Sequence, residues 1–291
     1  MRTITDEHLQ AYQEGGCLQK LFDVIKEDPE LSFEIRMNNK VMIYYHKDRI
    51  LTISYCKGKP SIDTLSEKYY KNATLPSVSF EDGDLIQTLR DKRQLRQYFR
   101  EAKRLVSSYK AGVEFEVQQN IALENRSFSN RFVVVDMEWQ LPQSDIKKEE
   151  RISRTRIDLV VVDTQKNERG ENDIYLGELK VGMGATDGNS GIDAHIKKTN
   201  KLICSPKACA VLRADVERII RQKAALGLLE GDYAGLNLSD TPRMMLILAD
   251  RGSEERRALE MEGEKAQEWA KARGMAEPLI VWPNAQNILD V

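Results

Sequence analysis

Apolar runs and amphipathic stretches alternate along most of the chain, and they predict a mixed α/β fold. Each predicted strand is a short apolar run rich in β-branched or aromatic residues and bounded by polar turn residues. Each predicted helix is longer and has an apolar side. In the second half of the chain, strands are expected at residues 131–141, 154–163, 173–181, 243–250 and 277–282, and helices at 113–125, 190–203, 208–229 and 254–273.

Residues 1–84 have a different pattern, which predicts a small, β-rich N-terminal unit of unknown role. A short helix is expected at 18–28. Three apolar runs follow it, broken by Asn-Asn and Lys-Asp pairs, and they predict a meander of short strands. These runs are residues 31–39, 41–48 and 49–58. The polar, proline-containing segment after them is expected to be an irregular connection.

The character of the chain changes at Asp84, so a second and larger domain is expected over 85–291. Asp84 and Gln87 fit a capping box at the start of a helix. The outer face of this helix carries seven cations against two acids. A cationic face can contact phosphates, although charge runs of this kind are usually a solvated surface. The arginines predicted to bind nucleic acid are Arg93, Arg96, Arg100 and Arg104.

The hairpin expected at 154–181 holds the candidate chemistry. Successive side chains of a strand point to opposite faces, so Glu178 and Lys180 share one face. Antiparallel pairing of the two strands brings Asp158 beside them if it lies on the same face. Buried charges without partners are expensive, and a divalent cation with oxygen ligands would relieve that cost.

The order Asp158, then Glu178-x-Lys180 on the next strand, resembles the PD-(D/E)XK nuclease superfamily. Ile157 stands where the motif name has proline. The predicted order of helix, three strands, helix and strand over 111–249 is similar to the αβββαβ core of these restriction-endonuclease-like proteins. The resemblance implies a hydrolase that cuts phosphodiester bonds with Mg²⁺ or Mn²⁺.

The resemblance also implies roles for further residues. Glu114 would be a metal-directed glutamate on the helix before the first core strand, with Glu116 as the alternative, and the Leu179 carbonyl would be a further metal ligand. Two surface glutamates near a helix start are an equally good interpretation. The accessory candidates are Gln222, Arg156 and His195. Gln222 is the less similar position, because Leu226 stands where relatives carry tyrosine.

Composition limits the class of protein. The chain has 291 residues, 41% of them hydrophobic and 31% charged, and a formal net charge of -2. These values are typical of a globular protein and exclude a uniformly basic nucleic-acid binder. The chain has no apolar run of 18 residues, its first residues are polar, and its four cysteines are scattered. We therefore expect a cytoplasmic protein with reduced thiols and no membrane contact.

Three functions remain open from the sequence. The first is a metal-dependent nuclease, with DNA as the expected substrate, in a bacterial restriction, repair or phage-defence setting that only the resemblance implies. The second is a nuclease-like nucleic-acid-binding or scaffolding module without turnover. The third is an unrelated α/β protein whose strand carboxylates are structural ion pairs. For an enzyme that cuts both strands of a duplex, a homodimer is expected.

Overall fold

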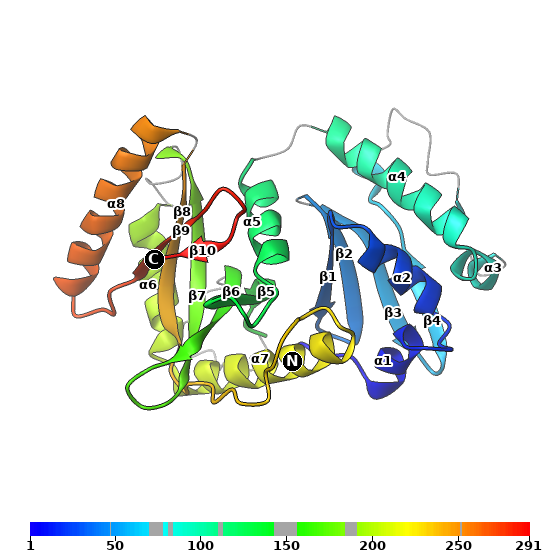
Figure 1. The fold of residues 1–291 in the computed structure, drawn as a ribbon, viewed down its shortest axis with the longest axis horizontal. Helices are drawn as coiled ribbons and strands as arrows, with labels where there is room; N and C mark the ends of the chain where they lie inside the picture. The colour runs from blue at the N-terminus through cyan, green and yellow to red at the C-terminus, as the bar shows by residue number, and fades with distance from the viewer. Residues whose placement is uncertain are drawn as a thin grey trace. The chain divides into compact units, whose positions relative to one another are not determined.

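The computed structural model describes residues 1–46, 48–69, 78–80, 84–109, 113–142, 156–183, 191–250 and 252–291. The chain forms two compact units. Unit 1 comprises Met1–Gln119 and Arg221–Leu228, and unit 2 comprises Asn120–Ile220 and Leu229–Val291. The predicted mixed α/β class is confirmed (Figure 1). The predicted boundary at residue 84 differs from the observed division, because the helices after it belong to unit 1.

Unit 1 contains a four-stranded antiparallel sheet in the order β1-β2-β3-β4. Its strands are β1 Leu31–Arg36, β2 Lys40–Tyr45, β3 Asp48–Cys56 and β4 Lys59–Asp63. The first three confirm the predicted meander. The expectation of an irregular connection after them is wrong at β4. Lys57 and Gly58 both have positive φ, as in the two-residue turns that close hairpins, and this turn pairs β4 with β3.

The helices of unit 1 are amphipathic and pack on this sheet. They are α1 Asp6–Tyr12, α2 Gln19–Glu27, α3 Leu85–Leu89 and α4 Lys92–Ser108, with a 3-10 turn at Glu67–Tyr69. α4 buries Leu95, Tyr98 and Phe99, which join the core with strand residues such as Ile43 and Leu51. This apolar face holds α4 to the first sheet, which explains why the boundary lies after α4.

The helix predicted from Asp84 is two helices, and the predicted capping box is wrong. Asp84 makes no side-chain cap hydrogen bond. Asp91 instead caps α4, because its Oδ1 accepts hydrogen bonds from the backbone N–H groups of Arg93 and Gln94 at 2.8 and 3.4 Å. An aspartate in this position satisfies backbone donors that the first helical turn leaves open.

We expect Asp91→Ala to lower the free energy of unfolding by about 1 kcal/mol, the usual cost of removing an N-cap. Asp84→Ala is the matched control, since it removes the same charge from a position that provides no cap. Urea unfolding followed by circular dichroism measures both variants. Equal destabilisation by the two substitutions would contradict the assigned cap.

A buried cluster of charged side chains lies on the face of β1 that carries Glu34 and Arg36. The Lys223 Nζ is 2.9 Å from Glu34 Oε2, and Arg36 Nη1 is 3.7 Å from the same oxygen. All three residues are buried. Burial raises the pKa of the Glu34 carboxyl, but Lys223 and Arg36 together outweigh it, so this pKa lies below its ordinary value. Glu34 is therefore held in unit 1 as a carboxylate.

Unit 2 contains a six-stranded mixed sheet in the order β10-β9-β8-β7-β6-β5. Its strands are β5 Phe132–Gln140, β6 Arg156–Lys166, β7 Asn172–Val181, β8 Arg243–Ala249, β9 Leu279–Pro283 and β10 Leu289–Asp290. Strands β5, β6 and β7 pair antiparallel, and β7, β8 and β9 pair parallel. The five strands predicted in this half are confirmed, and β10 is additional.

Three helices cover one face of this sheet, α6 Ile192–Ile203, α7 Pro206–Ala225 and α8 Ser253–Lys271. α5 Val113–Glu124 spans the division between the units, and its part in unit 2, residues 120–124, lies on the opposite side of the sheet from α8 (Figure 1). The central strand β7 is therefore buried at every position. Among the described helices, none combines the length and apolar character needed to cross a membrane. The polar excursion expected after β5 and the loop expected after β7 lie largely in 143–155 and 184–190, outside the described residues.

Candidate functional site

Three candidate side chains come from neighbouring strands in unit 2, as the sequence predicts. Strands β6 and β7 pair antiparallel, with Leu159 opposite Gly177. This is the last pair of the ladder at that end, and Asp158 lies just beyond it. Glu178 and Lys180, two residues apart on β7, share one face. The antiparallel hairpin is confirmed, and the predicted common face of Asp158 with Glu178 stays a prediction.

Glu178 lies at the centre of a buried group of charged and polar side chains. Lys180 Nζ is 2.8 Å from Glu178 Oε1, and His195 Nδ1 is 2.8 Å from Glu178 Oε2. The Glu178 and Lys180 side chains are 5% and 4% exposed, whereas His195 is 21% exposed. His195 comes from the first turns of α6, and its contact with Glu178 brings this accessory candidate into the group.

Asp158 joins the same group through the backbone of β7. Its Oδ2 accepts a hydrogen bond from the Leu179 N–H at 3.0 Å. The N–H and C=O of one strand residue point to the same neighbouring strand. The Leu179 carbonyl therefore faces the edge at which Asp158 lies, just beyond the last regular pair of β6 and β7. Two carboxylates and a carbonyl oxygen thus come from one short stretch of the hairpin.

This donor set suits a hard divalent cation. Mg²⁺ is typically held by one or two carboxylates and keeps several water molecules. The formal charges of Asp158, Glu178 and Lys180 add to one negative charge, which favours a cation. Within the described part of the chain, no three His, Cys, Asp or Glu side chains are grouped so that they could hold a metal ion. A cation at Asp158 and Glu178 would therefore complete its shell with carbonyl oxygen, water and substrate.

The Glu178–Lys180 pair changes the reason for expecting a metal. The sequence suggested that buried charges without partners would need a cation to offset their cost. Lys180 and His195 already contact both oxygens of Glu178, so the protein itself offsets much of that cost. What favours a metal is the remaining negative charge and the oxygen-rich donor set. A cation that binds Glu178 would compete with Lys180 for it.

Two accessory candidates have structural partners. Gln222 holds the backbone of Ile4 in unit 1, accepting a hydrogen bond from its N–H at 3.1 Å and donating one to its carbonyl at 2.6 Å. Arg156 Nε lies 2.7 Å from Glu138 Oε2 on β5. These contacts use both amide atoms of Gln222 and pair Arg156 with a local acid. Gln222 is therefore a buried residue with a structural role in unit 1, and the charge of Arg156 is balanced locally.

The glutamates proposed to direct the metal lie at the start of α5. Glu114 is half-buried and Glu116 is exposed, and both belong to the part of α5 assigned to unit 1. Their preference over surface glutamates stays a prediction. The four arginines predicted to contact nucleic acid lie on α4 in unit 1. Arg93, Arg100 and Arg104 are exposed, and Arg96 forms an ion pair with Glu27.

Asp136 on β5 is a buried carboxylate that the sequence analysis did not select. It stands opposite Val160, two residues along β6 from Asp158. The pairing of β5 with β6 shifts register between Val134 and Asp136, so Asp136 lies at an irregular point of the sheet. The signal was available in the sequence, because Asp136 interrupts an apolar run in the same way as Asp158 does.

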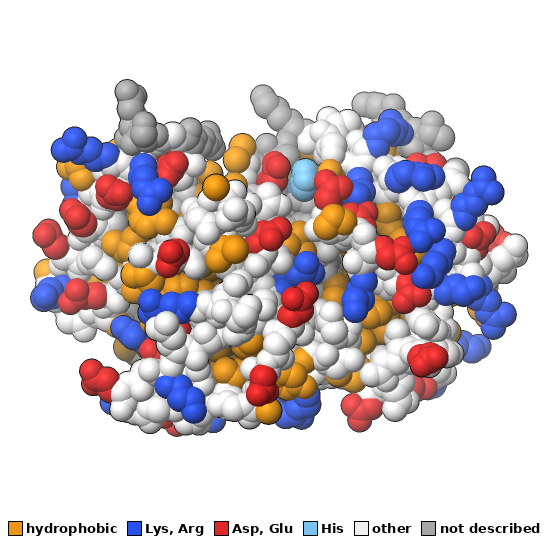
Figure 2. Space-filling view, viewed as in Figure 1, with side chains coloured by type: hydrophobic (Ala, Val, Ile, Leu, Met, Phe, Trp, Pro, Cys, Tyr) orange, Lys and Arg blue, Asp and Glu red, His pale blue; other side chains and the backbone are white. Residues whose placement is uncertain are grey.

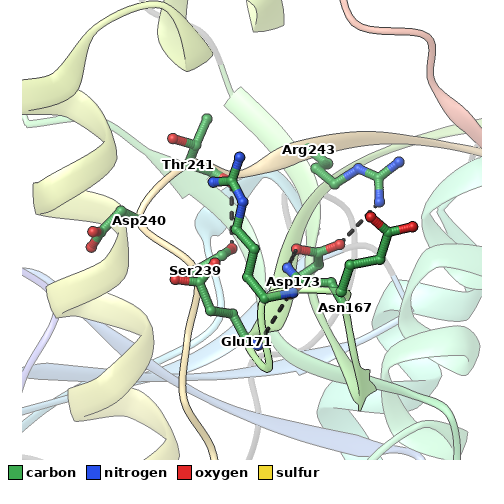
Figure 3. A pocket seen from close by; sticks show the side chains of 9 residues that line it. Asn167, Glu171, Asp173, Ser239, Asp240, Thr241 and Arg243 are labelled. Carbon is green, nitrogen blue, oxygen red and sulfur yellow. Dashed lines mark hydrogen bonds and ion pairs between the residues drawn. The ribbon is translucent and has the colours of Figure 1, made fainter.

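A polar hollow of about 710 Å³ lies at the other end of β7, about 23 Å along the strand from Lys180 at 3.3 Å per residue. Arg243 Nη1 lies 3.0 Å from Asp173 Oδ2, and Asn167 Nδ2 lies 2.8 Å from Asp173 Oδ1 (Figure 3). These polar groups contact one another and shape the turn between β6 and β7. The hollow is thus a separate feature from the group around Glu178.

No protein-family model, curated protein or solved structure matches the chain. Function is therefore inferred from side chains and their surroundings, since a fold class by itself does not imply an activity.

Proposed function

We propose that the protein is a metal-dependent nuclease that hydrolyses phosphodiester bonds of DNA at Asp158, Glu178 and Lys180. The observation that carries the proposal is the buried Glu178–Lys180 pair at 2.8 Å, together with the hydrogen bond from the Leu179 N–H between them to Asp158 Oδ2 at 3.0 Å. Phosphodiester hydrolysis needs a held water molecule, added negative charge on phosphorus to be stabilised, and protonation of the leaving oxygen. Asp158 and Glu178 offer oxygen ligands for a cation. The Lys180 amine can hold the water molecule and stabilise the added negative charge.

The order of elements around the group supports the same proposal. A helix, three antiparallel strands, two helices and a strand parallel to the third follow one another as α5, β5, β6, β7, α6, α7 and β8. The nuclease superfamily whose motif Asp158 and Glu178-x-Lys180 resemble is expected to have a helix, three strands, a helix and a strand, and the chain has two helices where that order has one. Asp158 lies on β6, and Glu178 and Lys180 lie on β7.

The residues have distinct tasks in the proposed reaction. Asp158, Glu178 and the Leu179 carbonyl would hold Mg²⁺ or Mn²⁺, which when bound supplies positive charge to polarise the phosphate and lower the pKa of water. Lys180, held by Glu178, orients the attacking water and donates a hydrogen bond to the developing charge. His195, held through Nδ1, keeps Glu178 oriented as a positioning residue.

Incubation with nucleic acids tests this activity. The full chain is incubated with supercoiled plasmid, linear duplex, single-stranded DNA and RNA, each with Mg²⁺, Mn²⁺ or EDTA. We expect the plasmid to be nicked or linearised with either metal and to remain intact in EDTA. Absence of cleavage on every substrate, or cleavage that persists in EDTA, would overturn the proposal.

The alternative function is a nuclease-like module that binds nucleic acid without cutting it. Lys180 and His195 already contact both oxygens of Glu178, which favours the third possibility, a protein whose strand carboxylates are structural ion pairs. Mg²⁺ binding is expected of the nuclease and of a metal-dependent binding module, but not of a purely structural ion-pair network. Cleavage of nucleic acid is expected of the nuclease alone.

We expect calorimetry to detect Mg²⁺ binding to the wild-type chain and a roughly tenfold or larger loss of affinity in Asp158→Asn, which removes a ligand charge but keeps the shape. Asp232→Asn is the matched control, because Asp232 is an exposed turn residue with the same charge change. Equal affinity in the wild type and Asp158→Asn would exclude Asp158 as a ligand.

A further inference from the structure

The cations of α4 divide into two rows with different surroundings in unit 1. The inner row pairs with acids that follow or lie on α2. Lys92 Nζ lies 2.8 Å from Asp23, Arg96 Nη2 lies 2.6 Å from Glu27, and Lys103 Nζ lies 2.7 Å from Asp28. These pairs attach α4 to its neighbours in unit 1, and their charges are already balanced.

The outer row consists of Arg93, Arg100 and Arg104, all of them exposed. Each residue of an α-helix is turned by about 100° from the one before it, so these positions share one stripe beside the inner row. At a rise of 1.5 Å per residue the stripe is about 16 Å long. Among the described residues, no carboxylate lies within ion-pair distance of any of the three guanidinium groups. Within the part of the chain that the structure describes, no acid balances these three charges.

The stripe continues into a hollow at the start of α4. The hollow has a volume of about 860 Å³, and its lining includes Lys20, Arg90, Lys92 and Arg93. The one acid in the lining, Asp91, is engaged as the N-cap of α4. Figure 2 shows Lys and Arg side chains gathered over the region of α3 and α4. A chain with a net charge of -2 thus carries a concentrated positive surface in unit 1.

We infer that this surface, the outer row with the adjoining hollow, binds the sugar-phosphate backbone of duplex nucleic acid. Arginine matches phosphate geometry with its planar donors, and regularly spaced arginines match a polyanion. Surfaces that bind single strands add aromatic side chains on which bases stack. The aromatic side chains within α4, Tyr98 and Phe99, are both buried, so among the described residues of this helix none adds a base-stacking side chain to the arginine stripe. Binding is therefore independent of base sequence and strongly salt-dependent.

This inference takes its choice of ligand from the proposed function, but its test is separate from cleavage. Anisotropy of a labelled duplex DNA is measured with the full chain in EDTA over a range of salt concentrations. The triple variant Arg93→Gln/Arg100→Gln/Arg104→Gln is expected to bind roughly tenfold to a hundredfold more weakly. The slope of log affinity against log salt is expected to fall by about three, one unit for each lost phosphate contact.

The matched control is Lys201→Gln/Lys207→Gln/Arg257→Gln, which removes three exposed cations of unit 2. It should retain wild-type affinity within about threefold, since it changes net charge without touching the stripe. Thermal melting checks that both triple variants remain folded. The inference is overturned if both variants weaken equally, if the wild type does not bind duplex in EDTA, or if it binds phosphatidylserine vesicles in preference to duplex. Duplex binding without any cleavage would contradict the nuclease proposal and would still support duplex binding by this surface.

Discussion

Lys180→Met is expected to abolish phosphodiester cleavage, lowering its rate roughly a thousandfold or more. Removing a positioned group that acts on the attacking water usually has an effect of this size. Methionine keeps the length and apolar stem of lysine and removes the ammonium group that lies 2.8 Å from Glu178. Because Lys180 competes with a cation for Glu178, the variant should bind Mg²⁺ at least as tightly as the wild type.

Three measurements make this result specific. Gel assays of plasmid nicking follow the rate, calorimetry follows Mg²⁺, and anisotropy follows duplex binding. Lys201→Met is the control, since it removes an exposed ammonium group from α6 and should cut normally. A Lys180→Met protein that cleaves at the wild-type rate would refute the role given to Lys180. Loss of cleavage together with loss of Mg²⁺ binding would show that Lys180 holds the site together and does not act on water.

Lys223→Met is expected to lower the free energy of unfolding by about 3 kcal/mol, the low end of the range for breaking a buried ion pair. The substitution leaves the Glu34 carboxylate 3% exposed with Arg36 as its remaining cation. Lys271→Met is the control, because the ion pair of Lys271 with Glu277 is largely exposed and should contribute nothing measurable. Urea unfolding of both variants measures the difference.

The effect of Lys223→Met should depend on pH in a defined direction. The pKa of Glu34 is lowered on folding, so its ion pairs stabilise the protein above the ordinary glutamate pKa and lose that contribution as the pH falls through the folded-state value. The destabilisation should therefore be largest near neutral pH and shrink below about pH 4, where the unfolded-state glutamate takes up a proton. A destabilisation that stays constant down to that pH would show that lost packing of the Lys223 stem, and not the charge, is responsible.

Alternation of side chains along strands made the candidate site predictable. The common face of Glu178 and Lys180 follows from a period of two, and the antiparallel pairing with the strand of Asp158 is strongly favoured by a short polar turn between two apolar runs. The sequence left open whether His195 contacts the site. It could name His195 as a candidate, because α6 follows β7 closely in the chain. Local chemistry of this kind needs no knowledge of distant residues.

Contacts between distant residues were not predictable in the same way. The Asp84 box and the Asp91 cap look alike in sequence, and which residue caps a helix depends on where the chain turns. Glu34 and Lys223 are 189 residues apart, and nothing local indicates that one neutralises the other. Gln222 resembled a site residue until its partner was seen to be the backbone of Ile4.

By itself, the sequence determined the class of fold, most of the strands and helices, and the common face of Glu178 and Lys180, because hydrophobic periodicity and turn residues act over a few positions. Only the tertiary structure decided where unit 1 ends, which cations of α4 are balanced by acids, and that Lys180 and His195 share Glu178. Each of these depends on which surfaces meet once apolar faces are buried, and that outcome belongs to the whole chain and not to any one segment.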